Sequence, residues 1–275
     1  MTAADLPFIL RLKGEAGWNQ TENDIRRCLA LAPDGCFVAE YDANPAGTAA
    51  ALVMGRVGWI AMVLVDPRLR RRGIGEALMR RALQSLDACD VHTVRLDATP
   101  MGQGIYARLG FVADSLVARY TGIAALPSGP PFEGLRAYTG TDFAAIVDLD
   151  RAATGMDRRE LYRRLLADNP GVTCVAERGG CFAGFVTTRT GAQATQVGPC
   201  MATDPSAGRD LLADALRRQT GRNVFVDVPV GNADGARVAA AAGLTVQRHL
   251  TRMVKGPPSV ARPELIWSTF GPEKG

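Results

Sequence analysis

Short apolar runs, separated by glycine and proline, recur along the whole 275-residue chain. In the first half, alternating β-branched runs and helical apolar spacing predict helices up to about Leu31, strands over 36–41, 46–54 and 58–65, a helix over 74–86, a strand over 92–97, a short helix over 102–109, and a closing strand over 111–121. Strands mixed with amphipathic helices in this order predict a mixed α/β (α+β) fold with helices covering a sheet.

The second half repeats the same order of elements. It predicts helical structure over 141–168, a hairpin over 173–178 and 180–188, a strand over 194–201, a helix over 208–219, a strand over 223–228, a helix over 233–242, and a closing strand over 245–254. The proline- and glycine-rich stretch from Leu126 to Gly134 separates the two halves. We therefore predict two domains of similar fold, residues 1–126 and 135–275, joined by a linker at residues 127–134.

One strand–turn–helix segment carries a candidate phosphate site. The strand that ends in Val63–Val65 runs into Asp66-Pro67, an arginine-rich turn, and Gly73 and Gly75 at the start of a helix. Bare amides at a helix start, with arginines around them, bind phosphate groups. A dinucleotide fold would need a third glycine where Leu78 stands.

Two motifs resemble those of one enzyme family. Arg-x-x-Gly-x-Gly at 70–75 is similar to the pyrophosphate loop of the GNAT acetyltransferases, and Tyr-x-x-x-Gly-Phe at 106–111 to their second motif. The resemblance covers nearly the whole chain and implies tandem GNAT folds, each with a mixed, largely antiparallel central sheet. In this arrangement the chain resembles a bacterial two-domain family. It implies that acetyl-CoA (coenzyme A) binds at Val63, Leu64, Val65, Arg70, Arg71, Arg72, Gly73, Ile74, Gly75, Glu76 and Thr99.

The resemblance also places Tyr106 beside the sulfur of coenzyme A. A phenol with a pKa near 10 can protonate a departing thiolate, so Tyr106 is the candidate catalytic acid. The alternative is an aromatic side chain that only packs on its helix. Thr99 stands where many family members carry an asparagine seven residues before this tyrosine.

The acceptor site is predicted less sharply. Trp18 and Asn19 lie in the first helix–loop–helix, where the fold usually selects its substrate, and Asp97 ends a strand; all three are candidate substrate-binding residues. Trp18 and Asn19 fit a plain loop that covers the core equally well. The strand before the loop has no carboxylate, which leaves Asp97 and Glu22 as candidate bases. An acyl-cysteine route would need an activated thiol, which the Cys89–His92 spacing does not ensure, so direct transfer is favoured.

The second half lacks the candidate catalytic and phosphate-binding residues of the first half. Ala239 occupies the position of Tyr106, and the counterpart of the glycine loop, 202–209, has lost its arginine run. We therefore predict no second active site and a structural role for this half as a wall of the substrate cleft. Arg158 is either an anion-binding residue or a solvated helix charge.

The composition of the chain limits the classes of partner and the cellular location that we expect. The net charge is +4 and the basic residues outside one turn are scattered, which argues against nucleic acid as a partner. The six cysteines form no pair or cluster, so we expect reduced thiols and no metal site. No leader or membrane span is recognisable, which favours a cytoplasmic protein.

We expect an acyltransferase, monomeric or homodimeric, that transfers acetyl directly in a ternary complex to the amine of a small molecule. The alternatives are a non-catalytic acyl-CoA-binding or sensing protein and, less favoured, a nucleic-acid or protein scaffold.

Overall fold

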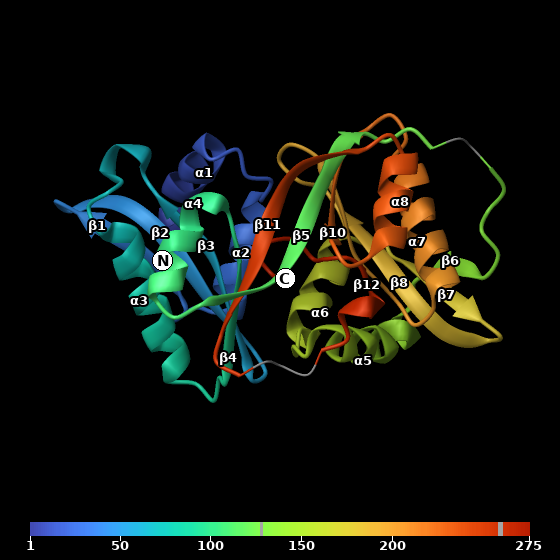
Figure 1. Cartoon of the computed structure of the whole chain (residues 1–275), viewed down its shortest axis with the longest axis horizontal. Helices are drawn as coiled ribbons and strands as arrows, with labels where there is room; N and C mark the ends of the chain where they lie inside the picture. Colours follow the sequence, from blue (N-terminus) through green and yellow to red (C-terminus); the bar gives the residue numbers. More distant parts are fainter. Residues whose placement is uncertain (127–128, 258–260) are drawn as a thin grey trace.

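The computed structural model describes residues 1–126, 129–257 and 261–275 and forms two lobes, each a sheet with helices against it (Figure 1). The predicted linker residues Pro127 and Ser128 lie outside these ranges. The first half contains helices α1 (Leu6–Glu15), α2 (Glu22–Leu31), α3 (Ile74–Asp87) and α4 (Pro100–Arg108), and strands β1 (Cys36–Tyr41), β2 (Asn44–Met54), β3 (Val57–Val65), β4 (Thr93–Ala98) and β5 (Val112–Ile123). Among the described residues, no helix is both long and apolar enough to cross a membrane.

The second half repeats this order. It contains helices α5 (Phe143–Thr154), α6 (Arg159–Asp168), α7 (Pro205–Arg217) and α8 (Ala233–Ala241), and strands β6 (Leu135–Ala137), β7 (Cys174–Arg178), β8 (Cys181–Arg189), β9 (Thr195–Ala202), β10 (Asn223–Pro229), β11 (Thr245–Lys255) and β12 (Ile266–Ser268). The predicted helical stretch 141–168 is divided at Gly155, whose φ of 71° ends α5. The short strands β6 and β12 had not been predicted.

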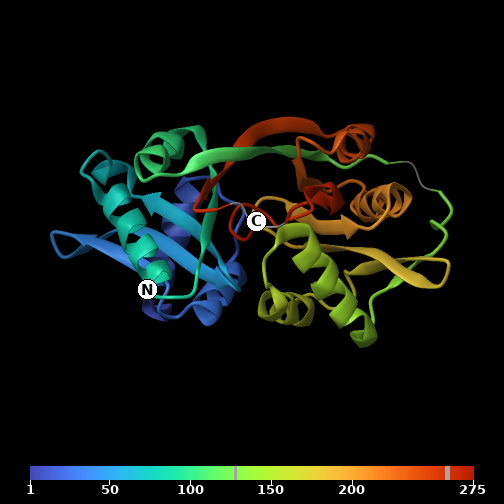
Figure 2. The ribbon, with the colours of Figure 1, turned by 60° about the horizontal axis from the view of Figure 1, so that its bottom comes forward.

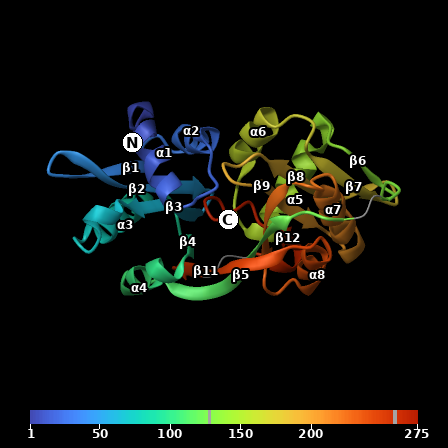
Figure 3. The ribbon, with the colours of Figure 1, turned by 90° about the horizontal axis from the view of Figure 1, so that it is seen from above.

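The two halves exchange their closing strands. β11 pairs antiparallel with β4 of the first half, and β5 pairs antiparallel with β10 of the second half. β5 and β11 also pair with each other, and Figures 2 and 3 show them running together from one lobe to the other. In the described part of the chain this produces one 12-stranded sheet, with eleven strands in the order β1-β2-β3-β4-β11-β5-β10-β9-β8-β7-β6 and β12 paired antiparallel with β9 beside this path. The mixed, mostly antiparallel fold is confirmed, but the two predicted sheets are continuous.

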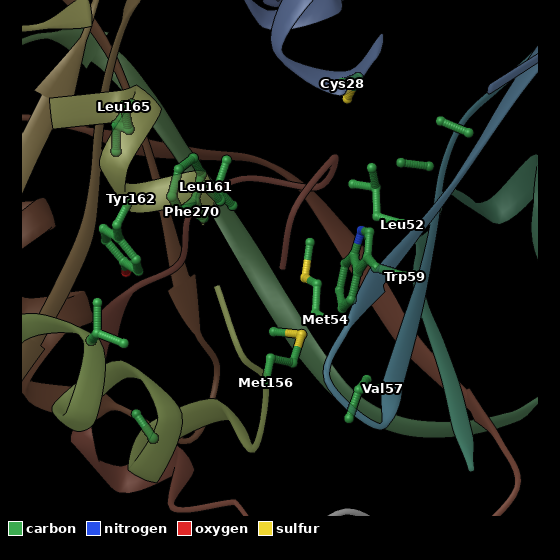
Figure 4. Close-up of a cluster of buried hydrophobic side chains, with 14 of the residues drawn as sticks. Cys28, Leu52, Met54, Val57, Trp59, Met156, Leu161, Tyr162, Leu165 and Phe270 are labelled. Carbon is green, nitrogen blue, oxygen red and sulfur yellow. The ribbon is translucent and has the colours of Figure 1, made fainter. Parts of the chain in front are cut away.

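The lobes also share a hydrophobic core. Trp59 and Met54 of the first half face Met156, Tyr162 and Phe270 of the second half within one buried cluster (Figure 4). The final segment of the structure passes between the lobes (Figure 1). There the indole N–H of Trp59 donates to the carbonyl of Pro272 at 3.2 Å. Apolar burial of this extent makes the lobes one folding unit rather than loosely tethered modules.

Candidate functional site

A split in the sheet opens the site. β3 pairs with β4 only from Val57 to Trp59, and the two strands diverge beyond that point. A bulge follows at Met62, which has a φ of 54° and whose carbonyl accepts a 2.7 Å bond from the Thr48 hydroxyl. Val63, Leu64 and Val65 come after this bulge and line a cleft. Their backbone groups on the β4 side are available to an extended ligand.

The start of α3 forms one end of this cleft. Gly73 is the N-cap with a φ of 79°, and no side chain in the described residues caps this helix start. The amides of the first turn therefore face the cleft with the positive end of the helix dipole. The preceding turn is held by Asp66, which accepts bonds from the Arg68 amide at 3.0 Å and from Arg11 at 2.8 Å. Side-chain hydrogen bonding by Arg68 keeps the pKa of Asp66 well below its usual range.

The arginines of the turn point in different directions. Arg70 and Arg71 line the cleft together with Ile74, Gly75 and Glu76. Arg72 instead donates to the Tyr41 hydroxyl at 2.8 Å, and its guanidinium lies 5.0 Å from the centre of that ring. Of the three arginines predicted to hold coenzyme A, the structure therefore places two at the cleft. The cleft has a volume of about 970 Å³.

Tyr106 lies at the other end of the cleft, on α4. Its ring folds back over Gly102 and meets Phe111 edge-on, with ring centres 6.3 Å apart. The phenol oxygen has no hydrogen-bond partner among the described residues. Burial raises the pKa of Tyr106 to about 12, so the phenol stays protonated at neutral pH. Thr99, the N-cap of α4, lines the same end of the cleft.

A smaller pocket of about 70 Å³ continues from the cleft beyond Tyr106. Trp18, Val63, Thr99, Tyr106 and Arg248 line both spaces. The remaining polar walls of the small pocket are Asn19, Gln20, Asp97, Arg119 and Glu273. The strand exchange and the final segment thus bring β5, β11 and residue 273 to a pocket whose other walls include β3, β4 and the loop before α2.

Two carboxylates line the small pocket. Asp97 is buried in a two-pronged ion pair with Arg252, with bonds of 2.8 and 2.9 Å. Burial raises the pKa of Glu273, but the charges of Lys274 and Arg189 outweigh it and lower the pKa to about 2. A carboxylate this acidic is a poor proton acceptor at neutral pH. Glu22, the other candidate base, is exposed and pairs with Arg26 outside both spaces.

Asn19 connects the two halves. Its side-chain oxygen accepts bonds from the amides of Gln193 and Ala194 at 2.9 and 3.1 Å, and its nitrogen donates to the carbonyl of Ala194 at 3.0 Å. The amide lies at the pocket wall, but these contacts use its hydrogen-bonding groups. Trp18 provides a flat wall to both spaces. The Asn19 contacts fit a positioning role better than direct substrate binding.

Similarity to known proteins agrees with this geometry. The acetyltransferase (GNAT) domain family matches residues 20–127, and a second GNAT domain family matches residues 146–267. The chain is a tandem GNAT protein. Holothin acyltransferase of a Pseudoalteromonas strain is 22% identical over 87% of this chain and 81% of its own length. N-alpha-acetyltransferase 30 of Xenopus laevis is 33% identical over 32% of this chain and 35% of its own length.

Solved structures show the same two-domain fold. A Pyrococcus horikoshii protein assigned to the acetyltransferases superposes with a TM-score of 0.86 at 21% identity, covering 100% of this chain and 94% of that one. A tandem GNAT protein from the clavulanic acid biosynthesis pathway gives 0.60 at 18% identity, covering 92% and 94%. At these identities the structural similarity establishes only the fold of this tandem GNAT chain.

The second GNAT domain has closed the counterpart of the phosphate site. Asp204 caps α7, and its carboxylate accepts from the amides of Ser206 and Ala207 at 2.8 and 3.0 Å. A phosphate would compete with this charge for the same amides. Ala239, in place of a tyrosine, is buried on α8. The amides at the start of α7 are therefore already occupied, unlike those at the start of α3.

Other candidates of the tandem GNAT protein lie outside the site. Arg158 is fully buried and bonds Asp150 at 3.0 Å and the carbonyl of Lys274 at 2.7 Å, so it is neither a solvated charge nor open to an anion. Cys89 is exposed, and His92 contacts Asp90 rather than this thiol. The described residues contain no cluster of three or more side chains suited to a metal ion.

Residues Arg119, Arg248 and Glu273 had not been predicted as site residues. Each reaches the pocket through the exchanged strands or the final segment, which no sequence motif announces.

Proposed function

We propose that the protein is an acetyl-CoA-dependent N-acetyltransferase that acts on the amine of a small molecule by direct transfer in a ternary complex. One observation carries the proposal: a single cleft leads from the uncapped amides of α3, past the Tyr106 phenol, into a small pocket walled by both halves. A cofactor with a phosphate end and a reactive thioester end fits that polarity. The narrow second pocket suits a small acceptor.

The residues present match the needs of coenzyme A. The amides at the start of α3, with Arg70 and Arg71, supply donors and positive charge for a pyrophosphate. Val63–Val65 offer strand-like backbone groups to the extended pantetheine arm. When bound, acetyl-CoA supplies an activated acyl group as a thioester.

The chain's own contribution to the reaction is proton transfer and orientation. With acetyl-CoA and an unprotonated amine bound in the two spaces, the Tyr106 hydroxyl would be placed to donate its proton to the departing thiolate sulfur, and the proton released by the amine nitrogen would return through solvent to the tyrosinate, so that the phenol is restored. Asp97, fixed by Arg252, and Glu273 place negative charge on the pocket wall and favour an amino group there. Binding both reactants in adjoining spaces makes the attack effectively unimolecular.

Replacing Arg70 by alanine is expected to weaken acetyl-CoA binding by about tenfold, since a charge-assisted contact to phosphate is lost at a partly exposed site. Arg72→Ala is the matched control, because that guanidinium lies on Tyr41 outside the cleft. Isothermal titration calorimetry with acetyl-CoA at two salt concentrations checks both variants. Equal losses in the two variants would show that the cleft is not the phosphate site.

The two glycines of α4 offer a second matched pair. A Cβ at Gly102 would lie 2.6 Å from the Tyr106 ring, whereas a Cβ at Gly104 meets only a flexible arginine tip at 3.8 Å. Both alanine variants gain helix propensity, roughly 0.5–1 kcal/mol. We expect Gly102→Ala to lower kcat at least about tenfold by displacing the phenol, while Gly104→Ala keeps kcat. Release of free thiol from acetyl-CoA and a melting curve measure the two effects, and a normal kcat in Gly102→Ala would contradict the assigned position of Tyr106.

A panel of small amines, incubated with acetyl-CoA and followed by free-thiol release and mass spectrometry, tests the function itself. Acetylated product from at least one amine supports it. Tight acetyl-CoA binding with no turnover of any amine would favour the non-catalytic acyl-CoA-binding alternative, and absence of acetyl-CoA binding would reject both.

A further inference from the structure

Arg248 carries a charge that is paired with no carboxylate in the part of the chain that the structure describes. It lies on β11 directly opposite Arg119 of β5, and Arg119 lies opposite Asp227 of β10. Directly opposed residues of an antiparallel pair project from the same face of the sheet. A bulge between Val246 and Arg248 sets this register. One face of the sheet therefore carries a row of two cations and one anion.

The anion of this row is fully used by the first cation. Arg119 donates to both carboxylate oxygens of Asp227, at 2.8 and 2.7 Å, and Gln196 donates to the same carboxylate at 3.0 Å. Arg248 forms no ion pair or hydrogen bond with any residue that the structure describes, and its Nε is buried without a partner. Burial and the nearby charge of Arg119 lower the pKa of Arg248. A half-buried, unpaired guanidinium beside a second one is unfavourable unless a ligand supplies an anion.

The position of Arg248 separates it from the phosphate end of the cleft. Arg248 lines both the cleft and the small pocket, at their junction with Tyr106 and Thr99. Arg70 and Gly73 line the cleft only. The unpaired charge is therefore directed at the place where acceptor and thioester meet.

We propose that Arg248 binds an anionic oxygen group of the acceptor, so that the acceptor is a small amine that also carries a carboxylate. This inference rests on the function proposed above. The small volume beside Tyr106 and the planar fork of a guanidinium favour a carboxylate over a bulkier phosphate. Asp97 and Glu273, each paired with cations of the protein, present carboxylate oxygens to the same pocket that can accept hydrogen bonds from the amino end.

Matched pairs of amines test this assignment. Each pair is an amino acid and its carboxamide, which are similar in size but differ in negative charge; because the amine of the carboxamide is also less basic, kcat/KM is expressed per unprotonated amine. An aminophosphonate series distinguishes carboxylate from phosphate-like recognition. We expect kcat/KM for the amino acids to exceed that for the carboxamides by about 10- to 100-fold, the range of a charge-assisted contact. In Arg248→Gln this ratio should fall to about 1, and Arg248→Lys should restore part of it because it keeps the charge without the fork.

His249→Gln is the control, since His249 is exposed and projects from the opposite face of β11. Its ratio should equal that of the unmodified protein. Calorimetric binding of the N-acetyl amino acids and their carboxamides to the coenzyme A complex gives the same comparison without turnover. Three outcomes would overturn the inference. The first is equal turnover and binding of charged and uncharged members, and the second is no binding of any carboxylate member at about 10 mM. The third is a preference for the carboxylate that survives in Arg248→Gln. Acetyl-CoA binding together with turnover of any amine, measured separately, tests the proposed function independently of Arg248.

Discussion

Replacing Tyr106 by phenylalanine should lower kcat by about 10²- to 10⁴-fold, the usual contribution of a positioned general acid. The substitution removes only the hydroxyl, so the edge-on contact with Phe111 remains. Since the phenol oxygen bonds no described residue, stability and acetyl-CoA affinity should stay near those of the unmodified protein. Stopped assays of thiol release, with calorimetry for acetyl-CoA, separate these quantities.

The pH profile adds a second test of the same residue. Because burial raises the pKa of Tyr106 to about 12, the proton that it donates is still present well above pH 10. We therefore expect no loss of kcat from this group between pH 7 and pH 10 or so. A Tyr106→Phe enzyme with an unchanged kcat would reject the catalytic assignment, and a basic limb near pH 9 that disappears in the variant would reject the protonation state.

Replacing Phe270 by alanine should destabilise the protein by about 3–5 kcal/mol, the usual cost of removing a buried aromatic side chain. Phe270 is fully buried, packs edge-on against Tyr162 at 5.8 Å, and lies beneath the guanidinium of Arg158 at 5.5 Å. The final segment that it anchors also carries Glu273 to the acceptor pocket. We therefore expect KM for the acceptor to rise more than the Kd of acetyl-CoA.

Phe132→Ala is the matched control for this loss. Phe132 is only half-buried and its main described contact is an arginine stacked at 4.9 Å, which is worth about 0.5–1 kcal/mol. Urea unfolding with a common slope compares the two variants. A loss in Phe270→Ala no larger than that of the control would mean that the final segment is not part of the cooperative core.

The sequence predicted the elements whose causes are local. The strand before Asp66, the glycine at the left-handed N-cap of α3 and the amphipathic stripe after it each depend on neighbouring residues, so these were predicted within a few positions. The exchange of β5 and β11 was not predicted. Either closing strand presents a similar pattern of apolar residues to either half, and alternation alone does not say which sheet edge a strand joins.

In the site, too, the residues placed by local signals were predicted and those placed by tertiary contacts were not. Tyr106 and the cleft residues Arg70 and Arg71 follow from a motif, because the helix that holds them is fixed by short-range signals. The direction of Arg72 depends on Tyr41, a residue 31 positions earlier, and the partners of Asn19 lie 174 and 175 positions later. Arg248 reaches the pocket only through the exchange. Such contacts depend on tertiary pairing, which a single sequence does not display.

The exchanged strands make each half depend on the other for its sheet. A protein ending near residue 126 would expose the whole edge of β4 and leave β5 extended with no sheet to join, a combination prone to aggregation. It would also lose Arg248 and Glu273 from the small pocket beside Tyr106. The second half therefore completes both the sheet and the small pocket of the first half.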